Sequence, residues 1–288
     1  MKPSPFPPHP FFRFASAAFL GAGLLGGTLL VPAADPTPAA VATPPASTTP
    51  TATAAPAANV TNTAIVPVPR PGRWVTMHNG FVDLAKEGNI DVLFLGDSIT
   101  DYWRDDGATS AHRGKPVWDK YYGSMKAANF GISADRTQHV LWRLQNGEGQ
   151  RFKPKVVVLM IGTNNTGLEK PPLPPVPRNT VPEAIAGVTA VVQELRKDFP
   201  DAKILLLGIF PRGDKGDLER GQVAQINLAI MKLNDQKHVF YLDIGDKFLQ
   251  PDGSISPDVM KDKLHPTTKG YEIWAAAMQQ PLAELLKN

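Results

Sequence analysis

Three short, nearly continuous apolar runs stand out along the chain, and each is bounded by Gly, Pro or Asn. They cover residues 90–95, 155–161 and 203–210. Runs of Val, Ile and Leu of this length are typical of strands that are buried on both faces, as in a parallel sheet. Two weaker runs, at residues 127–130 and 239–244, raise the predicted number of strands to five.

Helical patterns alternate with these runs. Four segments carry them, at residues 136–144, 181–199, 218–233 and 268–286. Alternating strands and helices imply right-handed βαβ units, so the predicted fold class is α/β, a three-layer α/β/α sandwich around a five-stranded, mostly parallel sheet. In open sheets of this kind, ligands bind outside the carboxyl ends of the strands. The residues that directly follow each strand are therefore the first candidates for chemistry.

The first residues of the chain resemble an export signal. Lys2 and Arg13 precede an uncharged apolar run at residues 18–31. This arrangement indicates a secretory signal peptide, which we place at residues 1–33. The run is shorter than the roughly 20 residues that span a bilayer as a helix. We therefore predict a secreted or periplasmic protein without permanent membrane insertion, with retention of the segment as an anchor as the alternative.

Proline is concentrated in the first quarter of the chain. Fourteen of the 29 prolines precede Arg70. Residues 34–69 are rich in Ala, Pro and Thr and carry one charged side chain, so burial cannot offset their ordering entropy. We predict that residues 34–69 form a disordered linker and that residues 70–288 form one folded domain.

Composition and charge exclude several classes of site and partner. The chain has no Cys, which excludes disulfides, cysteine-ligated metal sites and a cysteine nucleophile. Without residues 1–33, the 30 Lys and Arg fall to 28 against 27 Asp and Glu. This balance argues against nucleic acid as a partner. Neither a dinucleotide-binding nor a phosphate-binding glycine motif is present.

Gly96-Asp97-Ser98 follows the first strand. Gly96 permits a sharp turn, and Ser98 then begins a helix with its hydroxyl exposed. The alternative is that Asp97 or Ser98 only caps that helix. A serine nucleophile needs a base and a group that orients the base. His265 is the best base, because Asp262 can fold back onto its Nδ1 and leave Nε2 for the serine. The alternative for this pair is a loop cap beside a surface histidine.

Two further turns follow strands and carry hydrogen-bond donors. The amide of Asn164 in Gly162-Thr163-Asn164-Asn165 can supply one donor, although an ordinary Asn-rich turn is the alternative. A backbone N–H in the turn at residues 131–135 can supply another. With the N–H of Ser98, three donors lie on one rim of the sheet. Oxyanion stabilisation in acyl transfer needs such donors, so their convergence favours a hydrolase.

The other five histidines are not predicted to act in catalysis. His139 lies in a helical pattern and His238 leads a strand, so we predict structural roles for both. His78 and His112 do not follow strands and are predicted to lie on the surface. His9 belongs to the predicted signal segment.

Four blocks of the sequence resemble the GDSL or SGNH hydrolases, a family named for its catalytic Ser, Gly, Asn and His. The segments VLFLGDSIT, NFGISADRTQHVLWRLQNGE, KPKVVVLMIGTNN and DKLHPT are similar to the catalytic subunits of intracellular platelet-activating factor acetylhydrolase and their bacterial relatives. The resemblance covers roughly residue 90 to the C-terminus. It implies a flavodoxin-like sheet (the SGNH hydrolase fold), no metal or cofactor, and ester hydrolysis through an acyl-enzyme.

The resemblance also implies residue roles. Ser98 matches the nucleophile, His265 the base, Asp262 its orienting carboxylate, and Asn164 an oxyanion donor beside the N–H of Ser98. Ala134 stands where the family has its oxyanion glycine, and its N–H can still donate if its φ does not require glycine. Gly131 is the alternative. Ile99, Thr163 and Leu264 match an acyl pocket of a size that prefers acetyl.

The sequence indicates only the class of substrate and leaves the oligomeric state open. Because the predicted export separates the protein from cytosolic lipid mediators, an acetylated carbohydrate is the leading substrate and any small ester is compatible. A lysophospholipase or short-chain lipid esterase is the first alternative. A glycan-binding module without turnover is the second. The resemblance permits a homodimer.

Overall fold

The computed structural model describes residues 61–107 and 114–287. The predicted signal peptide, most of the predicted linker, and His9 and His112 lie outside these residues. Among the described residues, no helix is both long and apolar enough to cross a membrane.

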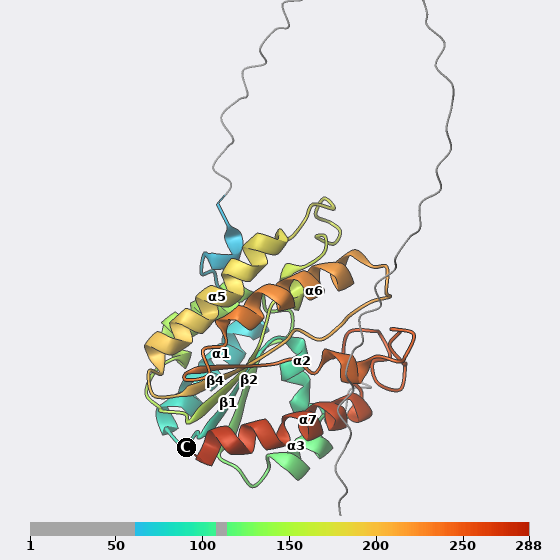
Figure 1. Ribbon diagram of the computed structural model, residues 1–288. Coiled ribbons are helices and arrows are strands. Elements are labelled where there is room, and N and C mark those ends of the chain that lie inside the picture. The colour runs from blue at the N-terminus through green and yellow to red at the C-terminus, as the bar shows by residue number, and fades with distance from the viewer. Residues whose placement is uncertain (1–60, 108–113, 288) are drawn as a thin grey trace, which may run out of the picture. The chain divides into compact units, whose positions relative to one another are not determined.

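A five-stranded sheet forms the centre of the folded unit (Figure 1). All four strand pairings are parallel, and the strand order is β2-β1-β3-β4-β5. The strands are β1 (Val92–Gly96), β2 (Ala127–Gly131), β3 (Val156–Met160), β4 (Lys203–Leu207) and β5 (Val239–Leu242). This order is that of flavodoxin-like sheets, and it changes direction between β1 and β3. The α/β fold and the five strands predicted from the apolar runs are confirmed.

Helices cover both faces of the sheet. They are α1 (Arg73–Glu87), α2 (Ser98–Asp101), α3 (Lys115–Tyr121), α4 (Thr137–Arg143), α5 (Val181–Asp198), α6 (Leu218–Ile230) and α7 (Thr268–Lys287). Helices α1, α4, α5 and α6 pack on one face, whereas α3 and α7 pack on the other (Figure 1). Alternate strand residues enter the two layers, so Leu93 and Leu95 lie in one core and Val92 and Phe94 in the other. Burial on both faces explains why β1, β3 and β4 have continuous apolar sequences.

Helices α4 to α7 match the predicted helical segments, whereas α1 and α3 were not predicted. In α1 the buried positions are Trp74, His78, Phe81 and Ala85. These positions have the spacing of three and four residues that marks a helix face. The polar His78 and the mid-helix Gly80 weakened this signal. His78, predicted to lie on the surface, is instead buried.

The folded unit begins before Arg70, which corrects part of the predicted linker. Residues 63–65 form a short 3₁₀ turn with Ala64 fully buried. The Thr137 hydroxyl donates to the Ala64 carbonyl at 2.8 Å, and the Asn179 amide donates to the Thr63 hydroxyl at 2.9 Å. These hydrogen bonds and the small Ala64 side chain order a segment whose composition alone suggests disorder.

Gly187 of α5 makes the close approach of this segment possible and generates a stability prediction. A Cβ at Gly187 would lie 2.3 Å from Thr137 Oγ1 and 3.0 Å from Ala64 Cβ, whereas one at Gly221 of α6 would meet open space. Gly187→Ala should therefore lower the free energy of unfolding, by about 1–3 kcal/mol, through overpacking. Gly221→Ala should raise it by about 0.5–1 kcal/mol because Ala is the better helix former. Urea unfolding measures both changes, and equal stabilisation by the two substitutions would contradict the close packing.

Candidate active site

Ser98 lies directly beyond the carboxyl end of β1. A Cβ at Gly96 would lie 2.4 Å from the Met160 carbonyl oxygen, so only glycine fits where the strand turns. Asp97 then caps α2, with its Oδ1 accepting from the Ile99 N–H at 3.0 Å. The helix cap and the placed serine thus coexist, and the two interpretations of this tripeptide do not exclude each other.

The structure joins Ser98 and His265 across 167 residues of sequence. The Ser98 hydroxyl lies 2.9 Å from His265 Nε2, and His265 Nδ1 lies 2.6 Å from Asp262 Oδ2. Asp262 Oδ1 accepts from the backbone N–H groups of His265 at 2.8 Å and Leu264 at 3.1 Å. With Nδ1–H donated to the carboxylate, Nε2 is the acceptor for the serine hydroxyl. The arrangement matches the order nucleophile, base and orienting acid.

Asp262 is held in its ionised form. Burial opposes its ionisation, but hydrogen bonds from the His265 backbone and ring and from Leu264 N–H outweigh it and lower the pKa of this carboxyl. A carboxylate that stays charged keeps the imidazole in one tautomer and favours the imidazolium when the ring takes a proton. The Tyr102 ring packs against the His265 ring with a centroid separation of 5.1 Å.

Ala134 occupies a position that favours glycine. The turn at residues 132–135 is closed by the Asp135 N–H, which donates to the Ile132 carbonyl at 3.1 Å, and Ala134 has φ of 64° at its third position. Positive φ at this position of a turn is why glycine is common there, and it costs alanine about 1–2 kcal/mol. Gly131, the alternative donor, has its N–H bonded to the Asn129 side chain at 2.8 Å. The Gly131 N–H is therefore already engaged, and Ala134 stays the predicted donor.

Asn164 lies on the same rim, directly after β3. Its Nδ2 donates to the Asp135 carbonyl at 3.0 Å. An amide nitrogen carries two hydrogens, so this bond orients the group and uses only one of them. The neighbouring Asn165 has a structural role, because its Oδ1 accepts from the Thr137 N–H at the start of α4 at 3.1 Å.

The predicted acyl-pocket residues are largely enclosed. Ile99 and Thr163 are buried, and Leu264 is half-buried against the core beneath α7. Arg212, which follows β4, donates to the Thr163 carbonyl at 2.9 Å and supports the Asn164 turn. Arg212 was not among the predicted site residues, although it too follows a strand. The acyl-pocket roles stay predictions.

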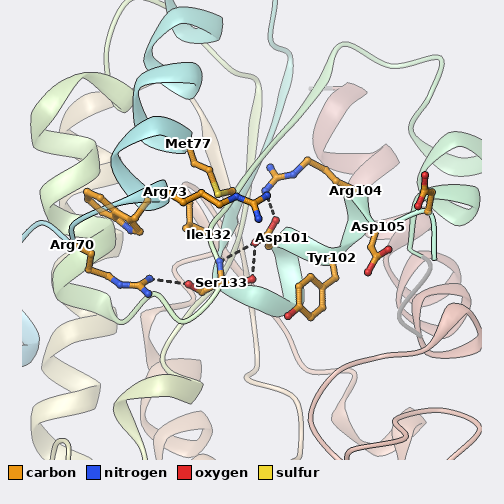
Figure 2. Close-up of a pocket in the computed structure, with 11 residues that line it drawn as sticks. Arg70, Arg73, Met77, Asp101, Tyr102, Arg104, Asp105, Ile132 and Ser133 are labelled. Atoms are coloured by element: carbon orange, nitrogen blue, oxygen red, sulfur yellow. Dashed lines mark hydrogen bonds and ion pairs between the residues drawn. The ribbon is translucent and has the colours of Figure 1, made fainter. Parts of the chain in front are cut away.

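A cavity of about 700 Å³ opens beside these groups (Figure 2). Tyr102 lines it and also contacts His265, and Ser133 lines it one residue before Ala134. Its charged lining residues are Arg70, Arg73, Arg104, Asp101, Asp105 and Asp106. Polar groups thus surround much of this cavity, which reaches the site through Tyr102 and Ser133.

The other described histidines lie away from the Ser98 hydroxyl. His139 Nδ1 accepts from the Arg136 N–H at 2.9 Å at the start of α4, which confirms its structural role. Burial and nearby arginines lower the pKa of His139 to about 3. His78 Nδ1 lies 2.8 Å from Glu148 Oε1 in the interior. In residues 61–107 and 114–287, no group of three or more His, Cys, Asp or Glu side chains could hold a metal ion.

Comparison with known proteins gives consistent matches. The GDSL-like lipase/acylhydrolase family matches residues 94–273. Platelet-activating factor acetylhydrolase IB subunit alpha2 of Rattus norvegicus is 37% identical over 232 residues, which covers 78% of this chain and 91% of the relative.

Two solved structures share the fold. A Streptococcus pneumonia protein described as a candidate platelet activating factor has a TM-score of 0.56 and 22% identity, covering 72% of this chain and 92% of that one. A GDSL-like lipase of Bacteroides thetaiotaomicron has a TM-score of 0.54 and 18% identity, covering 74% and 96%.

Asp97 generates a pH prediction. Complete burial raises its pKa from 3.8 to about 7, although the Ile99 N–H and Arg212 act in the opposite direction. Between about pH 4 and 7 the native protein therefore holds a proton that the unfolded chain has released, so this group's contribution to stability falls as pH rises. Asp97→Asn keeps an acceptor for the cap but cannot titrate.

The unfolding free energy of wild type relative to Asp97→Asn should accordingly be highest near pH 4 and fall by on the order of 2–4 kcal/mol by pH 7. Urea unfolding at several pH values measures this difference. Parallel profiles for the two proteins would contradict the raised pKa.

Proposed function

This chain belongs to the GDSL-like lipase/acylhydrolase family and is a carboxylic ester hydrolase, and we propose that it removes short acyl groups, above all acetyl, with Ser98 as nucleophile. The hydrogen-bonded series from Ser98 through His265 to Asp262 carries this proposal, with separations of 2.9 and 2.6 Å. A serine aligned with a base, and a base aligned with a carboxylate, form the arrangement that activates a hydroxyl for acyl transfer.

The proposed reaction has two stages. His265 Nε2 takes the Ser98 proton as the serine oxygen attacks the ester carbonyl carbon, and it then gives that proton to the departing alcohol. Water, deprotonated by the same nitrogen, next attacks the carbonyl carbon of the acyl-enzyme. The bond to the Ser98 oxygen breaks, Nε2 returns its proton to that oxygen, and the acid leaves. Asp262 stabilises the imidazolium in both stages without taking its proton.

Three donors are proposed to hold the oxyanion. The Ser98 N–H lies in the first turn of α2, where a backbone N–H has no partner within the helix. The N–H of Ala134 and the second amide hydrogen of Asn164 come from the neighbouring strand ends. In other enzymes, removing one such donor costs about 2.7–4 kcal/mol of transition-state stabilisation.

The cavity beside the site supports a polar alcohol. Arginine and aspartate side chains line much of its roughly 700 Å³. Charged walls suit hydroxyl groups better than an alkyl chain, because burying unpaired polar groups against alkyl carbon is unfavourable. We therefore favour an acetylated carbohydrate over a lysophospholipid or other lipid ester.

The N-terminal segment completes this proposal. We propose that residues 1–33 direct export, which would bring the enzyme to carbohydrates outside the cytoplasm. A homodimer stays a prediction. A glycan-binding module without turnover is disfavoured, because binding alone needs no bond between Ser98 and His265.

Ser98→Ala should lower kcat for 4-nitrophenyl acetate by on the order of 10⁴–10⁶ with the fold intact, because the nucleophile is lost. Steady-state kinetics measures the loss, and circular dichroism checks the fold. Ser254→Ala is the matched control and should keep full activity, because the Ser254 hydroxyl bonds to Asp252 in its own turn. Near-normal turnover by Ser98→Ala would refute the assignment, and an inactive wild type would favour the binding module.

A panel of substrates tests the preference for the acyl group and for the alcohol of the ester. Wild type should hydrolyse 4-nitrophenyl acetate with a higher kcat/KM than the octanoate, by about tenfold or more, because a pocket closed by buried side chains excludes a long acyl group. Acetylated xylan and chitooligosaccharides should release acetate faster than a lysophospholipid releases fatty acid. Equal rates with acetate and octanoate would contradict the acyl pocket, and preference for the lysophospholipid would support the lipid esterase instead.

A further inference from the structure

Arg70 bonds to both residues that flank Ala134. Its Nη1 donates to the Ser133 carbonyl at 2.8 Å and to Asp135 Oδ1 at 3.0 Å (Figure 2 shows the contact with Ser133). Ala134 has the positive φ that alanine disfavours, so the turn at residues 132–135 is not held by local preference alone. One guanidinium nitrogen that bonds on either side of Ala134 restrains that turn from outside.

The Asp135 carboxylate is the second anchor of the turn, and it is completely buried. Besides Arg70, it accepts from Trp74 Nε1 at 2.7 Å and from Arg143 Nε at 2.9 Å. Arg143 is itself fixed by the Phe130 carbonyl at 3.0 Å and by Glu148. Donors from the segment before α1, from α1 and from α4 thus converge on one carboxylate.

The backbone of Asp135 connects this anchor to both proposed oxyanion donors. Its N–H closes the turn that presents Ala134, and its carbonyl accepts from the Asn164 amide at 3.0 Å. A displacement of Asp135 would therefore move the Ala134 N–H and the Asn164 amide together. Oxyanion donors work only when they are held in place before the reaction, so their supports affect rate.

Residues 62–70, which we name the N-terminal strap, are themselves fastened to α4. The Val68 N–H donates to the Gln138 carbonyl at 3.3 Å, and the Thr137 hydroxyl holds Ala64 at 2.8 Å. Neither the strap nor Trp74 lies within residues 94–273, which match the family. Two of the three side chains that bond to the Asp135 carboxylate, Arg70 and Trp74, thus lie outside the residues that match the family.

We infer that the N-terminal strap and α1 set the geometry of the proposed oxyanion hole, with Arg70 and Trp74 as positioning residues. The inference rests on the proposed function, because it assumes that Ala134 and Asn164 hold the oxyanion. It assigns a role in catalysis to a segment whose composition alone predicts a linker.

The test compares two substitutions that loosen Asp135 with two matched controls. Arg70→Met removes the guanidinium and keeps an unbranched apolar stem, and Trp74→Phe removes the indole N–H. Arg196→Met is the first control, since Arg196 also fastens a turn by bonds to the Phe199 and Ala202 carbonyls, at 3.2 and 2.8 Å, but at the α5–β4 connection. Trp142→Phe is the second control, since Trp142 packs 5.3 Å from Trp74 without bonding to Asp135.

With 4-nitrophenyl acetate, Arg70→Met and Trp74→Phe should lower kcat by about 10- to 100-fold, somewhat less than the loss of a whole donor, with KM within about threefold. Arg196→Met and Trp142→Phe should keep kcat within about twofold of wild type, even where urea unfolding shows a similar loss of stability. A fall in kcat that is confined to the first pair separates positioning from general destabilisation.

Three results would overturn the inference. The first is an unchanged kcat in both test variants, and the second is an equal fall of kcat in the two controls. The third is a rise in the KM of Arg70→Met with unchanged kcat, which would assign Arg70 to substrate binding. Wild type and Ser98→Ala are measured in the same assay. Active wild type and inactive Ser98→Ala, combined with any of these three results, would leave the proposed function standing and reject the strap alone.

Discussion

The parallel register of β1 with its two neighbours is the constraint on which the site depends. Gly96 pairs with Gly131 of β2 and with Met160 of β3, so the three strands end at one level. Side chains at either glycine would collide with backbone, because a Cβ at Gly131 would lie 2.3 Å from the Asp101 nitrogen. The turns that follow can therefore approach one another closely. The proposed nucleophile and oxyanion donors come from these three turns. His265 reaches them from the loop before α7. Helix α7 is itself tied to the site, because the hydroxyl of its Tyr271 donates to the Ile99 carbonyl at 2.8 Å.

Two carboxylates near this rim of the sheet, those of Asp135 and Asp262, each have hydrogen-bond donors that stabilise their charge. Burial raises the pKa of Asp135, although Arg143, Trp74 and Arg70 act against it. A carboxylate near the proposed oxyanion site would repel an oxyanion, and the two guanidinium groups bonded to Asp135 offset that repulsion. Asp262 differs, because its hydrogen bonds lower its pKa and keep it charged where an imidazolium is expected to form. The same side-chain type thus serves as a structural anchor and as the proposed orienting acid, and its surroundings decide which.

The N-terminal strap links stability and the proposed chemistry. Its Ala64 packs into the space that Gly187 leaves beside Thr137, and its Arg70 bonds to the turn at residues 132–135. Behind that turn, the interior series from Asp135 through Arg143 and Glu148 to His78 joins α4 to α1. A change in the packing of α1 or the strap can therefore reach the rim of the sheet through hydrogen bonds, without any contact with the substrate.

Local sequence determined much of this protein. Strands buried on both faces need continuous apolar runs, and a tight turn needs Gly96, so the sheet and the position of Ser98 could be predicted. The pairing of His265 with Ser98 could also be predicted, because a serine nucleophile needs a base and histidine suits that role. The tertiary structure alone decided that residues 61–69 are ordered, that His78 is buried, and that Arg70 and Trp74 bond to Asp135. Those hydrogen bonds join residues 61 to 70 positions apart. No local pattern encodes such contacts, because a polar side chain can be buried only where the folded chain supplies its partners.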